Sequence, residues 1–302
     1  MPDGVTARTR LRAVPPKAAE PSKPKVLIFG KPGVGKTWFA LTFPNVYYID
    51  TEGGANLAHY TDKLEKAGGV YLGQEQGSND FSVVLDQIKA LATEEHPYKT
   101  LVIDSISHLF GSEIANEQER LADARKKDEY GASRKPAISY MRRIVNWLDR
   151  LDMNVIIVAQ QRDEYGVTDK GERGVIGETF DCWDKLEYIL HLAFQAFNVG
   201  NAYKARVRKS RLVGFPKAEV FELSYDAFAD RYGRDVIESA VHTVDLADAE
   251  QIAELNDLME RVNMPPDWLE KCLKKDKAEY VRELSRTAVA AMCKMLKERI
   301  AL

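Results

Sequence analysis

The run from Lys25 to Thr37 combines residue types and spacing that could do chemistry. It reads Lys-Val-Leu-Ile-Phe-Gly-Lys-Pro-Gly-Val-Gly-Lys-Thr, an apolar stretch that leads into a glycine loop. The loop fits the phosphate-binding pattern Gly-x-x-x-x-Gly-Lys-Ser/Thr without a mismatch. Glycines let consecutive backbone N–H groups turn toward one anion, because a Cβ at these positions would obstruct the approach. The pattern therefore predicts a phosphate loop between a strand and a helix.

The chemistry expected at this loop is the binding of ATP with Mg²⁺. Lys36 can reach the β- and γ-phosphates, the Thr37 hydroxyl can bind Mg²⁺, and the helix expected from Lys36 adds its positive end. The alternative is a plain glycine turn, but such a match arises by chance only about once in a hundred chains of this length. The expected nucleotide-binding residues are Gly30, Lys31, Pro32, Gly33, Val34, Gly35, Lys36, Thr37 and Trp38.

Acidic side chains follow two further apolar stretches. Residues 45–50 lead to Glu52, and residues 99–103 lead to Asp104. The carboxyl ends of parallel strands carry ligand sites, because they open onto one crevice. We therefore expect Glu52 to act as the base for the water that attacks the γ-phosphate, the alternative being a turn acid. We expect Asp104 to hold Mg²⁺ together with Thr37.

A third apolar stretch, residues 154–159, ends in Gln160. An amide there can bond the γ-phosphate and report its loss to the following segment. Residues 163–181 are rich in glycine and show no apolar pattern, so they are predicted to form a long loop that is either functional or disordered.

A basic stretch, residues 125–136, separates two predicted helices at 106–124 and 137–151. Its side chains combine positive charge with one aromatic ring, as in sites that bind single-stranded nucleic acid. A solvated loop is the alternative interpretation of such a charge run. The residues expected to contact DNA are Arg125, Lys126, Lys127, Tyr130, Arg134 and Lys135.

Three more strands are predicted, at 183–192, 202–211 and 218–224, with a hairpin turn at 198–201. Lys209 and Arg211 lie two residues apart on the second of these strands and therefore point to one side. Protection of a sheet edge against pairing is one explanation of these charges.

Composition limits the class of protein. The chain has 302 residues, of which 45% are hydrophobic and 29% charged, with a net charge of −3. It contains no apolar run of membrane-spanning length and no apolar core of a secretory signal, so a cytoplasmic location is expected. The three cysteines are far apart and predict neither disulfides nor a zinc site. The charge excludes a globally basic nucleic-acid binder and leaves only local basic patches.

The chain divides into three predicted parts. Residues 1–24 combine prolines and cations without apolar periodicity, which predicts a disordered basic arm. Residues 25–240 are expected to form one α/β domain with a twisted, mostly parallel sheet flanked by helices. Residues 245–302 carry helical apolar periodicity and predict a small helical domain.

The motifs at 29–37, 49–52, 102–106 and 158–162 together resemble the core of RecA-type recombinases. Within that class the chain is most similar to phage-encoded RecA-like ATPases, often labelled AAA-family, that act as single-strand annealing proteins. The resemblance implies a RecA-like fold, catalytic Glu52, Mg²⁺-binding Asp104, γ-phosphate-sensing Gln160 and two DNA loops near 125–136 and 163–181. At the second loop the cations expected to bind DNA are Arg162, Lys170 and Arg173. Residues 209–217 are similar to a RecA segment whose two lysines reach the neighbouring subunit's ATP, which implies trans-acting Lys209 and Arg211.

From this we expect an ATP- and Mg²⁺-dependent, DNA-binding ATPase that supports recombination by annealing or pairing single strands. Its expected partners are single-stranded DNA, further copies of itself in a ring or filament, and a single-strand DNA-binding protein; no membrane is expected. Two alternatives stay open. One is a helicase-like DNA motor with the same core, and the other is a nucleotide-switched adaptor without DNA activity.

Overall fold

The computed structural model describes residues 22–54, 57–167, 171–265 and 267–300. Within these residues, nine strands form one sheet in the order β3-β2-β4-β5-β1-β7-β8-β9, and β6 pairs with β5. The strands are β1 (Lys25–Gly30), β2 (Val46–Asp50), β3 (Val70–Leu72), β4 (Thr100–Asp104), β5 (Asn154–Val167), β6 (Arg173–Phe180), β7 (Leu192–Val199), β8 (Ala202–Ser210) and β9 (Val220–Glu222). From β3 to β7 all neighbouring pairs are parallel, and only β6, β8 and β9 are antiparallel additions. This is a RecA-like core, as the sequence predicted.

Helices cover both faces of the sheet. On one face α3 (Phe81–Thr93), α4 (Ile106–Asp123), α5 (Arg134–Arg150) and the short α6 (Leu186–Ile189) pack against the sheet. On the other face lie α1 (Lys36–Ala40), α2 (Ala58–Lys66), α7 (Tyr225–Tyr232) and α8 (Arg234–Glu238). Because both faces are buried, the central strands are continuously apolar instead of alternating.

The alternation inside β1 shows how one strand serves both layers. Leu27 and Phe29 belong to the core under α3 to α6, whereas Val26 and Ile28 belong to the core under α1 and α7. All four side chains are at most 1% exposed. The strand that leads into the phosphate loop is thus fixed from two sides, which makes its last residue a rigid starting point for the loop.

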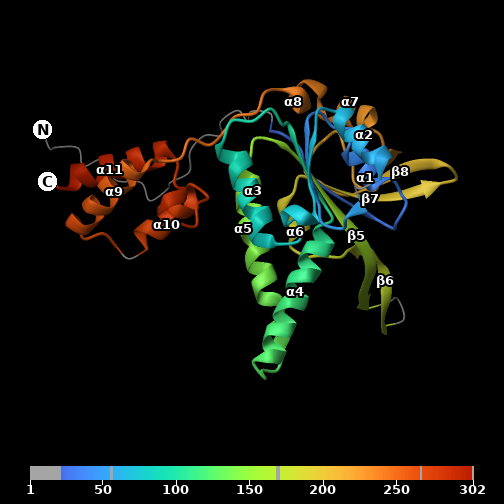
Figure 1. Cartoon of the computed structure of the whole chain (residues 1–302), viewed down its shortest axis with the longest axis horizontal. Helices are drawn as coiled ribbons and strands as arrows, with labels where there is room; N and C mark the ends of the chain where they lie inside the picture. The colour runs from blue at the N-terminus through green and yellow to red at the C-terminus, as the bar shows by residue number, and fades with distance from the viewer. Residues whose placement is uncertain (1–21, 55–56, 168–170, 266, 301–302) are drawn as a thin grey trace, which may run out of the picture.

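Two arms project beyond the carboxyl edge of the sheet (Figure 1). One is the antiparallel pair of α4 and α5, whose connection contains the single 3₁₀ turn Glu129–Gly131. The other is the ribbon of β5 and β6. In β5 the first six residues are buried, and the strand then continues outward with exposed side chains. In Figure 1 both arms point the same way.

The β5–β6 ribbon corrects the prediction of a long irregular loop at 163–181. The sequence of this segment has no period-two apolar pattern. Neither face of the ribbon packs on the core, so its strands need no alternation of apolar and polar residues. Its glycines pair across the two strands, as Gly166 does with Gly174. Residues 168–170, including the predicted DNA contact Lys170, lie outside the described residues.

The prediction of a strand at 183–192 is also wrong. Residues 186–189 form α6, and β7 begins only at Leu192. Leu186 and Leu190 are both buried, and a spacing of four residues places them on one side of a helical turn. The predicted turn is confirmed, because Val199 pairs with Ala202 across it, but it joins β7 to β8.

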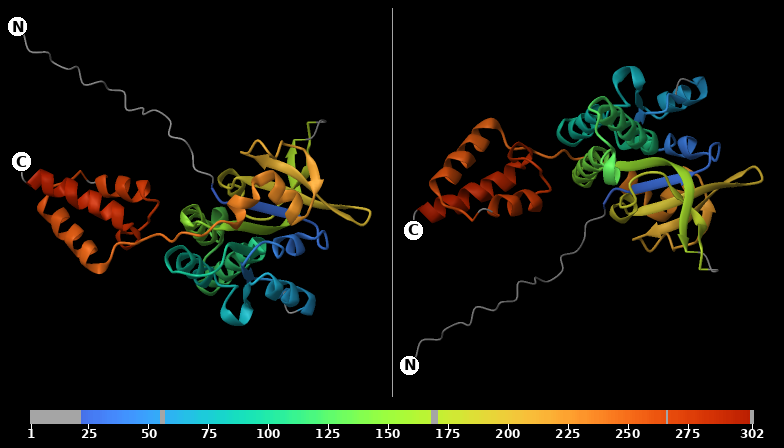
Figure 2. Two further views of the ribbon diagram at one scale, coloured as in Figure 1. Left: turned by 90° about the horizontal axis from the view of Figure 1, so that it is seen from above. Right: turned by 90° about the horizontal axis from the view of Figure 1, so that it is seen from below.

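The C-terminal helices α9 (Ala249–Arg261), α10 (Trp268–Lys275) and α11 (Arg286–Ile300) surround a separate apolar core. Figure 2 shows them to one side of the sheet. The segment between α10 and α11 forms ion pairs with the rest of the chain: the Glu279 carboxylate lies 2.9 Å from the Arg143 guanidinium, and the Glu283 carboxylate lies 3.5 Å from the Lys89 ammonium. We infer from the separate core that residues 245–302 form a small domain of their own.

Residues 1–21, most of the predicted basic arm, lie outside the described residues. Lys23 belongs to the fold instead of the arm, because it is only 4% exposed and donates to the carbonyl groups of Ile237 and Ser239. Within the described part of the chain, none of the helices combines the length and the apolar character needed to cross a membrane.

The close packing of β1 against β7 predicts the effect of one substitution. A Cβ on Gly30 would lie under 3.0 Å from the carbonyl oxygen of Ala196. Gly30→Ala should therefore lower the free energy of unfolding by about 2 kcal/mol, the cost of overpacking a rigid site. Urea unfolding without nucleotide measures this loss. Gly54→Ala is the control, because its Cβ would meet open space; equal effects of the two changes would contradict the packing argument.

Candidate nucleotide site

A cavity of about 490 Å³ lies at the carboxyl edge of the sheet. Its walls come from the phosphate loop and from the ends of β2, β4 and β5. Among the described residues that line it, Lys36 is the single cation, whereas Asp50, Glu52 and Asp104 are acidic. The site thus combines one lysine and the N–H groups of the loop with a group of carboxylates.

The phosphate loop turns back on itself around Lys36. The Lys36 ammonium donates to the carbonyl oxygens of Gly30 and Lys31, both at 2.9 Å. Gly33 and Gly35 have φ angles of 77° and 83°, a region that favours glycine. Burial lowers the pKa of Lys36, and the charges of Asp104 and Glu52 oppose that change. A bound phosphate would give this ammonium anionic acceptors in place of carbonyl groups.

Thr37 and Asp104 lie side by side at the base of the cavity. The Thr37 hydroxyl donates to Asp104 Oδ2 at 2.5 Å. Mg²⁺ prefers oxygen ligands and takes few of them from the protein, so one hydroxyl and one carboxylate are a suitable pair. These two residues are the ones that would hold the ion. Only 7% of Asp104 is exposed, and burial raises its pKa to about 6.

A short network positions Glu52 over this pair. The Asp50 carboxylate accepts from the backbone N–H groups of Glu52 (3.1 Å) and Gly53 (2.9 Å) and so fixes the turn after β2. The Ser105 hydroxyl donates to Glu52 Oε1. Gln160 Nε2 donates to the same oxygen at 2.7 Å. The carboxylate of Glu52 is therefore held by the ends of both β4 and β5.

The ends of β2 and β4 are also joined directly. The Thr51 hydroxyl donates to the carbonyl oxygen of Ser105 and accepts from the Ser105 N–H, both at 2.9 Å. Sequence reasoning missed Thr51 and Ser105. The small polar residues that follow each strand were a usable signal, because hydroxyl groups commonly satisfy the backbone at strand ends.

Two aromatic residues near the loop were also missed. Tyr203 of β8 packs on the loop, where a Cβ on Gly35 would lie 3.0 Å from its ring. Tyr60 of α2 lines the cavity. The predicted Trp38 faces away: the described cavity lining does not include it, and the Lys63 ammonium lies 3.8 Å from its ring centroid.

The first predicted DNA segment lies at the tip of the α4–α5 arm. Its predicted contacts are all exposed, and they are Arg125, Lys126, Lys127, Tyr130, Arg134 and Lys135. Tyr130 is 100% exposed. The last two cations belong to the first turn of α5 and not to a loop. The arm therefore presents cations around one fully accessible aromatic ring.

The second predicted DNA segment is less uniform. The Arg162 guanidinium forms ion pairs with the carboxylates of Asp184 at 2.7 Å and Asp181 at 3.6 Å, so two acids neutralise its charge at the root of the ribbon. Arg173 is exposed near the outer end of β6. Tyr165 and Val175, which the sequence did not single out, are paired across the ribbon and more than half exposed, at 62% and 51%.

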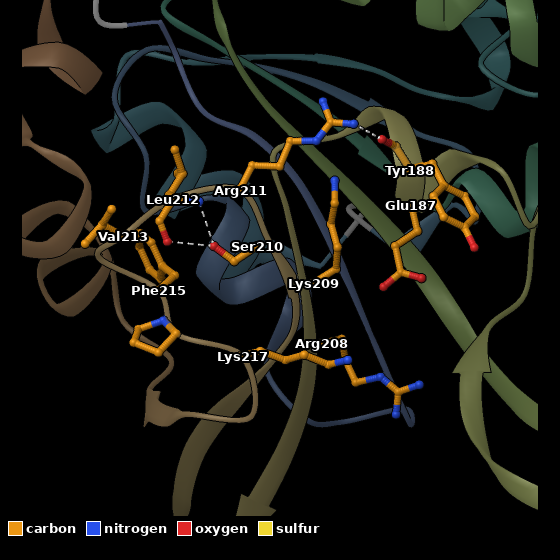
Figure 3. A pocket seen from close by; sticks show the side chains of 11 residues that line it. Glu187, Tyr188, Arg208, Lys209, Ser210, Arg211, Leu212, Val213, Phe215 and Lys217 are labelled. Atoms are coloured by element: carbon orange, nitrogen blue, oxygen red, sulfur yellow. Dashed lines mark hydrogen bonds between the residues drawn. The ribbon is translucent and has the colours of Figure 1, made fainter.

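Lys209 and Arg211 lie far from this cavity. Ser210 pairs with Leu192, which pairs with Val26, so these cations lie at the amino edge of the parallel strands. They border a second cavity of about 660 Å³, shown in Figure 3. There Lys209 donates to the carbonyl oxygen of Leu190 and Arg211 to that of Tyr188, whereas Arg208 points the opposite way.

The raised pKa of Asp104 predicts that replacing it with asparagine stabilises the protein at high pH but not at low pH. A folded-state pKa of about 6, above the usual value, means that Asp104 adds stability at pH 4 that is lost as the pH rises through 6. Asp104→Asn cannot ionise and should raise the free energy of unfolding at pH 8 by about 2 kcal/mol, with little change at pH 4. Chemical denaturation without nucleotide at both pH values measures this, with exposed Asp163→Asn as the control. An equal effect at both pH values would rule out a perturbed Asp104.

One of three comparisons with known proteins identifies the family of this chain. No curated protein matches the sequence. Among solved structures, the chain is similar to one described as the RadB recombinase, with 13% identity, a TM-score of 0.39, and coverage of 66% of this chain and 86% of that one. The model of the AAA domain family AAA_24 matches residues 22–193, which include the phosphate loop, Glu52, Asp104 and Gln160. The chain therefore belongs to this family of AAA domains, and its nucleotide site is that of a P-loop NTPase with a RecA-like core.

Proposed function

We propose that this protein is an ATP- and Mg²⁺-dependent ATPase of RecA type that binds single-stranded DNA and supports recombination by annealing or pairing strands. One observation carries the proposal. The nucleotide cavity lies at the same edge of the sheet from which the α4–α5 arm and the β5–β6 ribbon project, and Gln160 belongs to both the cavity and the ribbon strand.

In the proposed reaction each polar residue has one task. Lys36 and the N–H groups of the loop hold the β- and γ-phosphates, and Thr37 and Asp104 provide the oxygens for Mg²⁺, which neutralises phosphate charge when bound. Glu52 accepts the proton of the attacking water. Its hydrogen bonds from Ser105 and Gln160 fix its direction before the nucleotide arrives.

The two arms are the proposed DNA contacts. The α4–α5 tip offers cations for phosphates, and exposed Tyr130 offers a face on which a base can stack. The ribbon adds Arg173 and exposed Tyr165. Gln160 lies where β5 leaves the core, so a change at the γ-phosphate would reach the ribbon through a single strand. A single-strand DNA-binding protein remains a proposed further partner.

Assembly into a homo-oligomer, as a ring or a filament, is part of the proposal. The described lining of the nucleotide cavity holds one cation, which leaves a triphosphate short of positive charge. Lys209 and Arg211 are at the far edge of the same sheet and line an open cavity there together with Arg208 (Figure 3). We propose that they complete the site of a neighbouring copy; protection of the β8 region against pairing is the competing explanation.

ATP hydrolysis measured with and without single-stranded DNA tests the proposal. Wild-type protein should turn over ATP faster when DNA is present. Glu52→Gln should retain ATP binding and lose about 10²-fold or more in rate, because an amide cannot act as a base. Neutralising the cations of the α4–α5 tip should remove the stimulation and leave basal turnover.

The outcomes of that assay separate the candidate functions. Hydrolysis without any DNA effect would support a nucleotide-switched adaptor. Stimulation accompanied by unwinding of a duplex would support a helicase-like motor. Wild-type turnover in Glu52→Gln would remove Glu52 from the mechanism.

A mixing experiment tests the shared site. Lys209→Ala/Arg211→Ala protein and Lys36→Ala protein should each be inactive, and mixing them should restore ATPase activity at interfaces that pair an intact loop with intact cations. Trans-acting cations of this kind typically contribute about 10³- to 10⁵-fold in rate. Arg208→Ala is the matched control, since it lies on the same strand and points the other way. Mixed oligomers that stay inactive would count against the shared site.

A further inference from the structure

Glu178 of β6 reaches the phosphate loop from the projecting ribbon. Its Oε1 lies 3.7 Å from the Lys31 ammonium, and its Oε2 accepts from Gln195 Nε2 at 2.7 Å. Lys31 is the second residue of the loop, directly after Gly30. An ion pair therefore connects the loop to the strand of the ribbon that does not carry Gln160.

Gln195 fixes the position of Glu178. It lies in β7 opposite Phe29 and is only 7% exposed. Its amide also donates to Gln161 Oε1 at 3.3 Å. A buried amide must use its donors on fixed partners, because leaving them unsatisfied is costly. One oxygen of Glu178 is thus held by the core, and the other remains for Lys31.

Both strands of the ribbon are consequently tied to the nucleotide site. On β5 the connection is the hydrogen bond that Gln160 Nε2 donates to Glu52 Oε1 at 2.7 Å. On β6 it is the pair of Glu178 with Lys31. Next to them Phe180 packs on Phe29, with ring centroids 6.1 Å apart. The root of the ribbon is held at these points, and residues further out along β6 are exposed.

We propose that Glu178 is a positioning residue that makes the β6 side of the ribbon sensitive to nucleotide. The inference rests on the proposed binding of ATP at the loop. The phosphates bring several negative charges close to Lys31 and compete with the single charge of Glu178 for it. Occupancy weakens the bond between β6 and the loop, and the ribbon becomes looser.

The ion pair of Lys31 with Glu178 is weak enough for bound nucleotide to displace it. The Lys31 side chain is 73% exposed and that of Glu178 is 40% exposed, so the pair is weak and easily exchanged. Coupling is reciprocal: if bound nucleotide weakens the ion pair, the ion pair weakens nucleotide binding to the same extent. Without the charge of Glu178, this competition for Lys31 is absent.

Hydrogen exchange at the backbone amides of residues 171–180 tests this inference. In wild-type protein, Mg²⁺ with a non-hydrolysable ATP analogue should protect the phosphate loop and speed exchange in β6. Glu178→Gln keeps an acceptor for Gln195 but lacks the charge, so exchange in β6 should no longer respond to the analogue. Its affinity for the analogue should rise about two- to fivefold, the range of an exposed ion pair.

Two further variants exclude a merely structural effect. Glu178→Asp retains the charge and should restore the response of β6 to the analogue. Asp163→Asn removes a carboxylate directly opposite Glu178 in the ribbon and should leave the response unchanged. Loss of the response in both Glu178→Asp and Asp163→Asn would assign it to general weakening of the ribbon and overturn the inference.

The wild-type result separates this inference from the proposed function. A protected phosphate loop without any change in β6 overturns the coupling and leaves ATP binding intact. A phosphate loop that the analogue does not protect overturns the proposed function, and the coupling with it. A response in Glu178→Gln equal to that of wild-type protein likewise removes Glu178 from the coupling.

Discussion

The parallel register of four strands is the constraint on which the rest of the structure depends. Gly30 of β1 lies opposite Gln160 of β5, and Asp50 of β2 lies opposite Asp104 of β4. Because these parallel strands end at the same edge of the sheet, the residues that follow them lie close together. A shift of a single residue in any pair would turn these side chains to the other face. The buried side chains of β1 on both faces hold this register, so the two apolar cores also determine the chemistry at the edge.

Negative charge is concentrated in the site before any ligand arrives. Asp104 is buried with a raised pKa, and Glu52 and Asp50 lie nearby among hydrogen-bond donors from serine, glutamine and the backbone. Such an arrangement is costly in isolation and becomes favourable when a divalent cation joins it. A bound nucleotide with Mg²⁺, as proposed, would therefore balance the negative charge of this site.

The elements that carry strong local signals could be predicted from the sequence. The glycine loop, the apolar strands 26–29 and 101–103 and the acid Asp104 follow from pattern alone, because both faces of these strands are buried. The β5–β6 ribbon could not, since a free-standing ribbon requires no apolar alternation. Nor could the pairing of Glu178 with Lys31 or the position of Tyr203 on Gly35, because contacts between residues so far apart in sequence depend on the sheet order.

The length of β5 limits how this chain can vary among relatives. One strand runs from Asn154 in the core, through Gln160, to Val167 in the ribbon. An inserted residue before Gln160 would reverse the side on which its amide emerges and separate it from Glu52. Insertions beyond Val167 would only lengthen the ribbon. We therefore expect related chains to differ in length at the outer end of this arm and to keep an invariant number of residues between Asn154 and Gln160.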